Sequence, residues 1–167
     1  SDSLRLRERV TFCHLALGAP WPDWSIDGLL ATIDSWLTDY LMSATSQADI
    51  DQLNLTTLLR ASLPWPEGAD LDNIAPTVFR LPNGRDAEIS YLDDNGEPRP
   101  TVRARVQDVF GLDNHPAVAH MPITFELLSP ADRPIQVTSD LPGFWRGSWS
   151  DVRKDLAGRY PKHRWPE

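Results

Sequence analysis

Apolar side chains recur at steps of three and four in the first 75 residues of the chain. The clearest run follows Ser25, where acidic and hydroxyl side chains occupy the opposite face, as in an amphipathic helix. Its apolar positions are Ile26, Leu29, Leu30, Ile33, Trp36, Leu37, Tyr40 and Leu41. Ser25 is suited to cap this helix, because its hydroxyl can accept a backbone N–H of the first turn.

Further helices are predicted before residue 76. Ser46 followed by Asp49 resembles a capping box, and short helical segments follow at 50–53 and 55–63. The sequence LPWPEG (63–68) ends the second segment, because proline disfavours a helix at its own position and at the residue before it. Residues 1–75 are therefore predicted to form a helical part.

From Thr77 onward the apolar positions alternate, as in strands. The segments TVFRLP and AEISYL flank Asn83-Gly84, a strong hairpin signal because both residues tolerate positive φ. Alternation continues in TVRARV, ITFELL and IQVTS, which begin at residues 101, 123 and 135. Short links between these runs favour an antiparallel sheet of about four or five strands.

The pattern returns to helix near the C-terminus. Asp140 is suited to cap LPGFWRG, and Ser148 with Asp151 forms another capping-box pattern. Gly158 stands where a C-terminal glycine belongs. The inward stripe of this last helix consists of Trp149, Val152 and Leu156.

These patterns predict an α+β fold. A helical N-terminal part at 1–75 is followed, at 76–167, by a small, mainly antiparallel sheet with a C-terminal helix packed on it. We expect the two parts to share one core. The joints LPWPEG and IAP are too short and too apolar for a flexible linker, which would be rich in glycine, serine or charged residues.

Composition adds expectations about location. The 167 residues are 41% hydrophobic and 24% charged, as in globular proteins. There is no run of about 18 apolar residues and no signal-peptide core. The single cysteine, Cys13, fits a reducing cytoplasm and is predicted to be buried among apolar neighbours. Because the chain does not begin with methionine, we expect it to be a fragment of a longer protein.

Charge is distributed unevenly along the chain. The formal net charge is −8, whereas residues 143–167 carry six basic and three acidic side chains. The chain closes on GRYPKHRWPE, and aromatic residues are unusual in a disordered tail. This segment is therefore either docked on its own domain or available to a partner. A basic stretch suits nucleic acid, but a solvated face with one or two ion pairs also explains it.

Catalytic and metal-binding patterns are absent from the sequence. There is no GxxxxGK(S/T) loop and no GxGxxG after a strand. The four histidines, His14, His115, His120 and His163, have no partners at zinc-ligand spacing. No serine, nor Cys13, shows the neighbouring base that a nucleophile needs. We therefore assign no catalytic residue, metal or cofactor to these residues.

The run from Phe125 to Glu167 resembles the C-terminal signature of the HrpB family of bacterial ATP-dependent helicases, which are DExH-box proteins. The matching positions are Leu127–Ala131, Arg133-Pro134, Gln136, Thr138, Asp140-Leu141, Phe144-Trp145, Gly147-Ser148, Val152, Lys154, Gly158–His163 and Trp165-Pro166. Upstream, ARVQDVFGL, LPNG and LPW are also similar to family elements, so the likeness covers nearly the whole chain. Trp149 departs from the pattern, which has tyrosine there.

The resemblance implies that the chain is a C-terminal accessory domain of a larger helicase and is non-catalytic by itself. Two RecA-like motor domains, with ATP and Mg²⁺, would lie upstream in the same protein and would be its partners. RNA is the expected nucleic acid, by analogy with DExH relatives. None of the family's catalytic motifs matches this chain.

The candidate nucleic-acid-binding residues are the cations of the basic stretch and one tryptophan that helical periodicity does not assign to a core. They are Arg146, Arg153, Lys154, Arg159, Lys162, Arg164 and Trp165. Phosphate contacts of this kind give affinity without sequence preference. Two alternatives stay open: a protein-interaction module, suggested by the acidic helical half, and a hydrolase without a recognisable motif.

Overall fold

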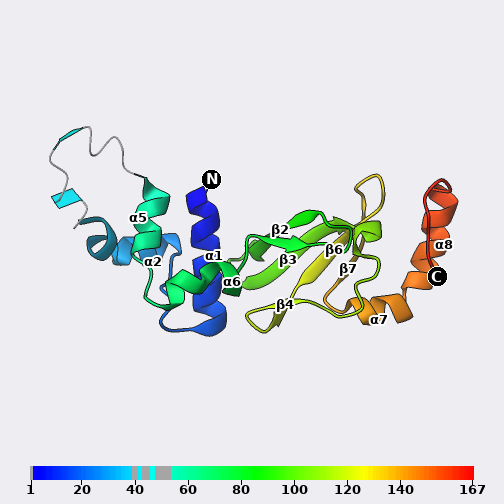
Figure 1. Cartoon of the computed structure of the whole chain (residues 1–167), viewed down its shortest axis with the longest axis horizontal. Helices are drawn as coiled ribbons and strands as arrows, with labels where there is room; N and C mark the ends of the chain where they lie inside the picture. Colours follow the sequence, from blue (N-terminus) through cyan, green and yellow to red (C-terminus); the bar gives the residue numbers. More distant parts are fainter. Residues whose placement is uncertain (1, 39–40, 43–45, 48–53) are drawn as a thin grey trace. The chain divides into compact units, whose positions relative to one another are not determined.

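The computed structural model of the protein describes residues 2–38, 41–42, 46–47 and 54–167. The chain divides into two compact units (Figure 1). The helical unit comprises Ser1–Ala75 together with the turn Asp94–Pro98, and the sheet unit comprises Pro76–Asp93 and Arg99–Glu167. The expectation that the two parts share one core stays a prediction.

Helices build the first unit, as the sequence predicts. They are α1 (Asp2–Leu17), α2 (Ile26–Ala31), α5 (Leu55–Ala61) and α6 (Leu71–Ile74), with a π-helical turn η1 (Asp34–Thr38) and a 3₁₀ turn η2 (Glu67–Asp70). The buried apolar residues are Leu6, Val10, Phe12, Cys13, Trp21, Trp24, Leu29, Leu59, Leu71 and Ala75. The predicted burial of Cys13 is confirmed, and burial raises the pKa of its thiol to about 11.

The helix predicted after Ser25 is only partly correct. Its cap is confirmed, because Ser25 Oγ accepts the Gly28 N–H at 3.2 Å. The helix itself ends at Ala31, with Thr32 as its C-cap, and the π-helical turn follows. Ile26 and Leu30 are each 62% exposed, so only Leu29 of these apolar positions in α2 is packed into the core. Asp49 of the second predicted cap and the helix at 50–53 lie outside the described residues.

The helix predicted at 55–63 is present as α5, and it ends before the proline-rich segment. Asn54 caps it, accepting the Thr57 N–H on Oδ1 at 3.0 Å. Helical periodicity did not indicate this cap.

Arg9 on α1 makes tertiary bonds that helical periodicity also did not indicate. It is 5% exposed, and its Nε donates to the Ala75 carbonyl at 2.7 Å. Its Nη2 lies 2.5 Å from Asp72 Oδ1, joining α1 to α6.

The second unit is built on a five-stranded sheet in the order β1-β2-β3-β6-β7. The strands are β1 (Val78–Arg80), β2 (Asp86–Leu92), β3 (Pro98–Arg105), β6 (Thr124–Leu128) and β7 (Pro134–Thr138). The predicted hairpin is confirmed, since β1 pairs with β2 antiparallel. Gly84 takes φ +85° in its turn, a conformation that favours glycine. The alternation in TVRARV is also confirmed, because Val102, Ala104 and Val106 are buried.

One strand pair differs from the prediction. The sheet is mainly antiparallel, but β3 and β6 run parallel. The link between them is long and includes the 3₁₀ turn η3 (Val106–Val109) and a small hairpin of β4 (Ala117–Val118) and β5 (Met121–Pro122). A parallel pair requires a long crossover connection, so the predicted short link was wrong between β3 and β6.

His115 has a structural role in this crossover. Its Nδ1 accepts the Leu141 N–H at 3.0 Å, so its Nε2 carries the proton and donates to the Ile123 carbonyl at 2.7 Å. Its ring packs edge-on against Phe125 of β6 at 5.5 Å. His120 lies in the β4–β5 turn with φ +64°. Both histidines therefore belong to the turn and loop geometry that their spacing indicated.

Two helices, α7 (Leu141–Arg146) and α8 (Trp149–Arg159), complete the unit, and α8 lies beyond one end of the sheet (Figure 1). The Asp140 cap is confirmed, because its Oδ1 accepts the Gly143 N–H at 3.0 Å. The Ser148 cap is wrong: this residue has helical φ and ψ and makes no side-chain capping bond. The helix also continues through Gly158 to Arg159, so Gly158 is not its terminating glycine.

No helix in the described part of the chain is long and apolar enough to cross a membrane.

Candidate nucleic-acid interface

The tail after α8, residues 160–167, folds back on that helix. Trp149 Nε1 donates to the Pro166 carbonyl at 3.2 Å, and Arg153 Nε donates to the Trp165 carbonyl at 3.1 Å. Trp165 Nε1 donates to the Tyr160 carbonyl at 3.0 Å. Of the two possibilities for this segment, we expected docking through Tyr160 and the prolines, with Arg159, Lys162 and Arg164 as a cationic rim. The segment is docked on its own unit.

An aromatic cluster lies beneath the tail. Its members are Phe110, Phe144, Trp145, Trp149 and Trp165, and their neighbouring ring centroids are 5.1 to 6.5 Å apart. Contacts of this geometry stabilise by about 0.5–1.5 kcal/mol each beyond area burial. Trp149 is buried at the centre, whereas Trp165 is half-buried at the edge. The cluster therefore fixes the tail and leaves Trp165 in reach of solvent.

Two further bonds tie α8 and the tail to the rest of the sheet unit. The Tyr160 hydroxyl donates to Ser129 Oγ at 3.4 Å, next to the end of β6. Gln107 Nε2 donates to His163 Nδ1 at 3.1 Å, so the proton of the neutral imidazole is on Nε2. These bonds hold Tyr160 and His163 in place while the cations between and beside them face solvent.

The six predicted cations differ in their partners. Arg153 is half-buried, and its Nη2 lies 3.6 Å from Glu167 Oε1. Arg159 pairs with Asp155 at 3.3 Å, one helical turn away. The other four are exposed and form no ion pair within the described residues: Arg146, Lys154, Lys162 and Arg164. Arg153 and Arg159 thus already have carboxylate partners, and these four carry the unpaired charge that a phosphate could meet.

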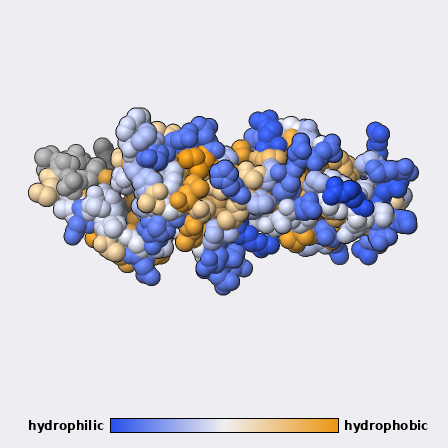
Figure 2. Space-filling model, turned by 90° about the horizontal axis from the view of Figure 1, so that it is seen from below, coloured by the Kyte–Doolittle hydropathy of each residue, from blue (hydrophilic) through white to orange (hydrophobic). Residues whose placement is uncertain are grey.

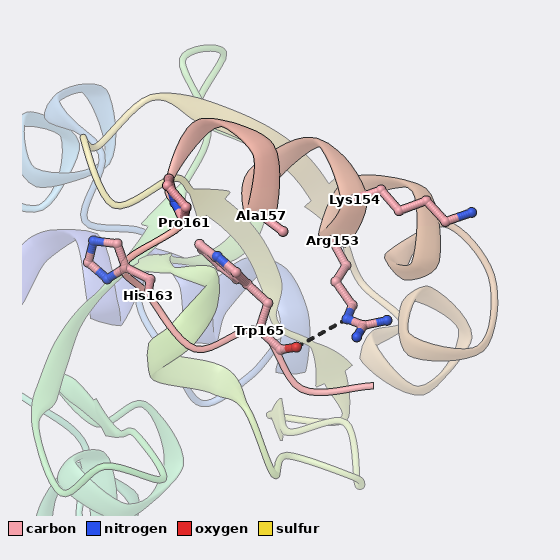
Figure 3. A pocket seen from close by; sticks show the side chains of 6 residues that line it. All are labelled: Arg153, Lys154, Ala157, Pro161, His163 and Trp165. Atoms are coloured by element: carbon pink, nitrogen blue, oxygen red, sulfur yellow. Dashed lines mark hydrogen bonds between the residues drawn. The ribbon is translucent and has the colours of Figure 1, made fainter.

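An open surface pocket of about 420 Å³ lies between α8 and the tail (Figure 3). Its lining consists of Arg153, Lys154, Ala157, Pro161, His163 and Trp165. Three of the predicted site residues, Arg153, Lys154 and Trp165, therefore meet here. Lys154 extends away from the indole of Trp165 toward solvent (Figure 3). Arg146, Arg159, Lys162 and Arg164 do not line the pocket.

His163 was missed as a site residue. Sequence reasoning considered it only as a metal ligand, although its position between Lys162 and Arg164 could have indicated it.

Among the described residues, no group of three His, Cys, Asp or Glu side chains is placed to hold a metal ion. What the pocket offers is cationic and aromatic: ammonium and guanidinium groups for phosphates, and flat rings on which a base could stack.

The fold and this C-terminal segment define the class of protein. Residues 36–167 match the model of the HrpB_C family, which is described as ATP-dependent helicase C-terminal. The chain belongs to this family, as the resemblance of its C-terminal run predicted.

Known relatives agree with this assignment. The ATP-dependent RNA helicase HrpB of Escherichia coli K12 is 37% identical over 149 residues, covering 88% of this chain and 18% of that protein. A crystal structure of the E. coli DExH-box NTPase HrpB matches 99% of this chain with a TM-score of 0.83 and 35% identity. A structure of the E. coli DEAH/RHA helicase HrpB matches with a TM-score of 0.72 and 32% identity. The chain spans about a fifth of the length of these relatives.

Proposed function

We propose that this chain is a non-catalytic accessory domain of an ATP-dependent helicase and that it holds RNA through the surface of α8 and its tail. ATP and Mg²⁺ would be bound by motor domains elsewhere in the same protein, and those domains would be its partners. The name of the E. coli relative, an ATP-dependent RNA helicase, supports RNA as the nucleic acid.

The observation that carries the proposal is a set of exposed cations on a fixed segment. Lys154, Lys162 and Arg164 are exposed beside the docked tail in a chain whose net charge is −8. Phosphate binding releases counterions, and this term provides affinity without base contacts. Because the whole chain repels a polyanion, binding by this chain alone is expected to be weak and to depend on these side chains.

Charge removal at this surface tests the proposal. Replacing Lys154, Lys162 and Arg164 together by alanine should weaken binding of single-stranded RNA to the 167-residue chain, measured by fluorescence anisotropy at low salt. The matched control replaces Arg85, Arg99 and Arg133, three exposed arginines of the sheet unit that change the net charge equally. Equal loss in both variants would mean that the effect is one of net charge, and the proposal would fail.

A second function is favoured by the apolar surface of the helical unit. Met42 and Trp65 are 79% and 83% exposed, and Leu15 and Leu17 of α1 are also exposed. Figure 2 shows hydrophobic surface over the helical unit. Exposed apolar surface can mark a protein contact. Under this alternative the chain packs on other helicase domains without touching RNA. Hydrogen exchange would then protect α1 and α2 in the intact helicase, and RNA would leave α8 unchanged.

A further inference from the structure

The indole of Trp165 is held in a fixed orientation at the edge of the pocket. Its Nε1 donates to the Tyr160 carbonyl at 3.0 Å, and its own carbonyl accepts Arg153 Nε at 3.1 Å. Its ring centroid lies 6.5 Å from that of buried Trp149. A ring fixed in advance loses little conformational entropy when a ligand stacks on it.

The remaining walls suit a flat, uncharged group. Ala157 and Pro161 supply apolar contact, and the ring of His163 lies 6.1 Å from that of Trp165 (Figure 3). His163 Nδ1 accepts from Gln107, which leaves the Nε2–H as the donor of the neutral ring. Lys154 stands at the rim, where a phosphate following the base would meet it.

From this arrangement we infer that the pocket binds one unpaired base of a single-stranded nucleic acid, stacked on Trp165, while the surrounding cations contact the backbone. The inference rests on the proposed function and narrows it. The fixed ring distinguishes this surface from a plain cationic patch, because stacking on an aromatic side chain requires a base that has left its own stack. A duplex keeps its bases stacked and offers this pocket only phosphates.

The first test uses the unmodified chain, so it does not depend on the folding of a variant. Binding of a ten-nucleotide oligouridylate is compared with binding of a stable abasic backbone of the same length, and with an RNA duplex. We expect the oligouridylate to bind about tenfold more tightly than the abasic strand, which is within the range known for stacking of one base. The Trp165 indole N–H resonance should shift with the oligouridylate and stay in place with the abasic strand.

The second test changes the ring. Trp165→Leu should reduce the preference for oligouridylate over the abasic strand to about onefold, whereas Trp165→Phe should keep most of it, because phenylalanine still offers a face for stacking. Thermal unfolding of both variants shows whether the tail stays docked. If Trp165→Leu also undocks it, the comparison of ligands on the unmodified chain decides.

The outcomes separate this inference from the proposed function. If the unmodified chain binds oligouridylate and the abasic strand equally, or binds the duplex more tightly than the single strand, the base pocket is wrong. The accessory function survives that result when the Lys154, Lys162 and Arg164 variant still weakens both strands. If the triple variant weakens neither, the proposed RNA surface itself is wrong.

Discussion

Two glycines near the C-terminus show how strongly context decides the role of a residue. A Cβ on Gly143 would lie 2.2 Å from Asp140 Oδ2, the carboxylate that caps α7. A Cβ on Gly158, inside α8, would meet no atom within 4 Å. The sequence assigned Gly158 a terminating role and gave Gly143 none. The residue type alone predicts neither role, because each depends on the atoms that surround the glycine.

Alanine substitutions at these glycines should therefore have opposite effects. Gly143→Ala should destabilise the chain by about 1 kcal/mol or more, because Asp140 must move and the cap is lost. Gly158→Ala should stabilise it by roughly 0.5–1 kcal/mol, since alanine restricts the unfolded chain more than glycine does. Chemical unfolding followed by circular dichroism measures both. A change of the same sign in the two variants would contradict these assignments.

Asp72 gives a prediction that depends on pH. The hydrogen bond from Arg9 lowers the pKa of its carboxyl below the ordinary value. A lowered folded-state pKa contributes stability above the unfolded pKa of about 3.9, and this is lost as pH falls through the folded value. Asp72→Asn should thus destabilise the chain at pH 7, and its difference from the unmodified chain should shrink below about pH 4. A difference that is constant with pH would rule out this ion pair as the cause.

Among the helices and strands, local side-chain hydrogen bonds explain why α2 is shorter than the apolar periodicity predicts. The apolar repeat continues past residue 32, yet α2 ends at Ala31. Thr32 Oγ1 donates to the Gly28 carbonyl at 3.0 Å, and Ser35 Oγ donates to the Thr32 carbonyl at 2.7 Å. Such side-chain bonds compete with the backbone bonds of a helix. The β1–β2 hairpin and the Asp140 cap were predictable because their signals are local, whereas the parallel β3–β6 pair depends on a crossover of distant residues.

The docked tail is expected to stabilise the sheet unit. Ending the chain after Arg159 removes four side-chain hydrogen bonds that join the tail to the rest of the sheet unit, and the contact of Trp165 with Trp149. The truncated chain should be less stable by about 2–4 kcal/mol, and Trp149 should become exposed. Urea unfolding and iodide quenching of tryptophan fluorescence measure the two effects. Unchanged stability would show that the tail adds nothing to the fold.

At the scale of the whole molecule, the family was recognisable from the sequence, but the pocket was not. The signature from Phe125 to Glu167 is contiguous in the sequence and could be matched directly. The pocket exists because the tail folds back and brings His163 and Trp165 beside Arg153 and Lys154. In the sequence the six predicted cations are equivalent. In the structure, ion pairs with Glu167 and Asp155 distinguish Arg153 and Arg159 from the other four.

A non-catalytic accessory domain should not hydrolyse ATP. The purified 167-residue chain is expected to show no phosphate release above buffer with ATP, Mg²⁺ and RNA present. This expectation rests on the proposed accessory function, in which motor domains elsewhere in the same protein bind ATP. Turnover that disappears on a single substitution within these residues would contradict it, whereas turnover unaffected by every such substitution would indicate a contaminant.

We propose that α8 and its tail bind phosphates, and the salt dependence of RNA binding can test this. The logarithm of the association constant is measured against the logarithm of salt concentration, for the unmodified chain and for the variant lacking Lys154, Lys162 and Arg164. If all three side chains contact phosphates, the slope for the variant should be less steep by about two units, since each contact to a single strand contributes about 0.7. Parallel lines of equal affinity would contradict the claim and leave these cations as solvated surface.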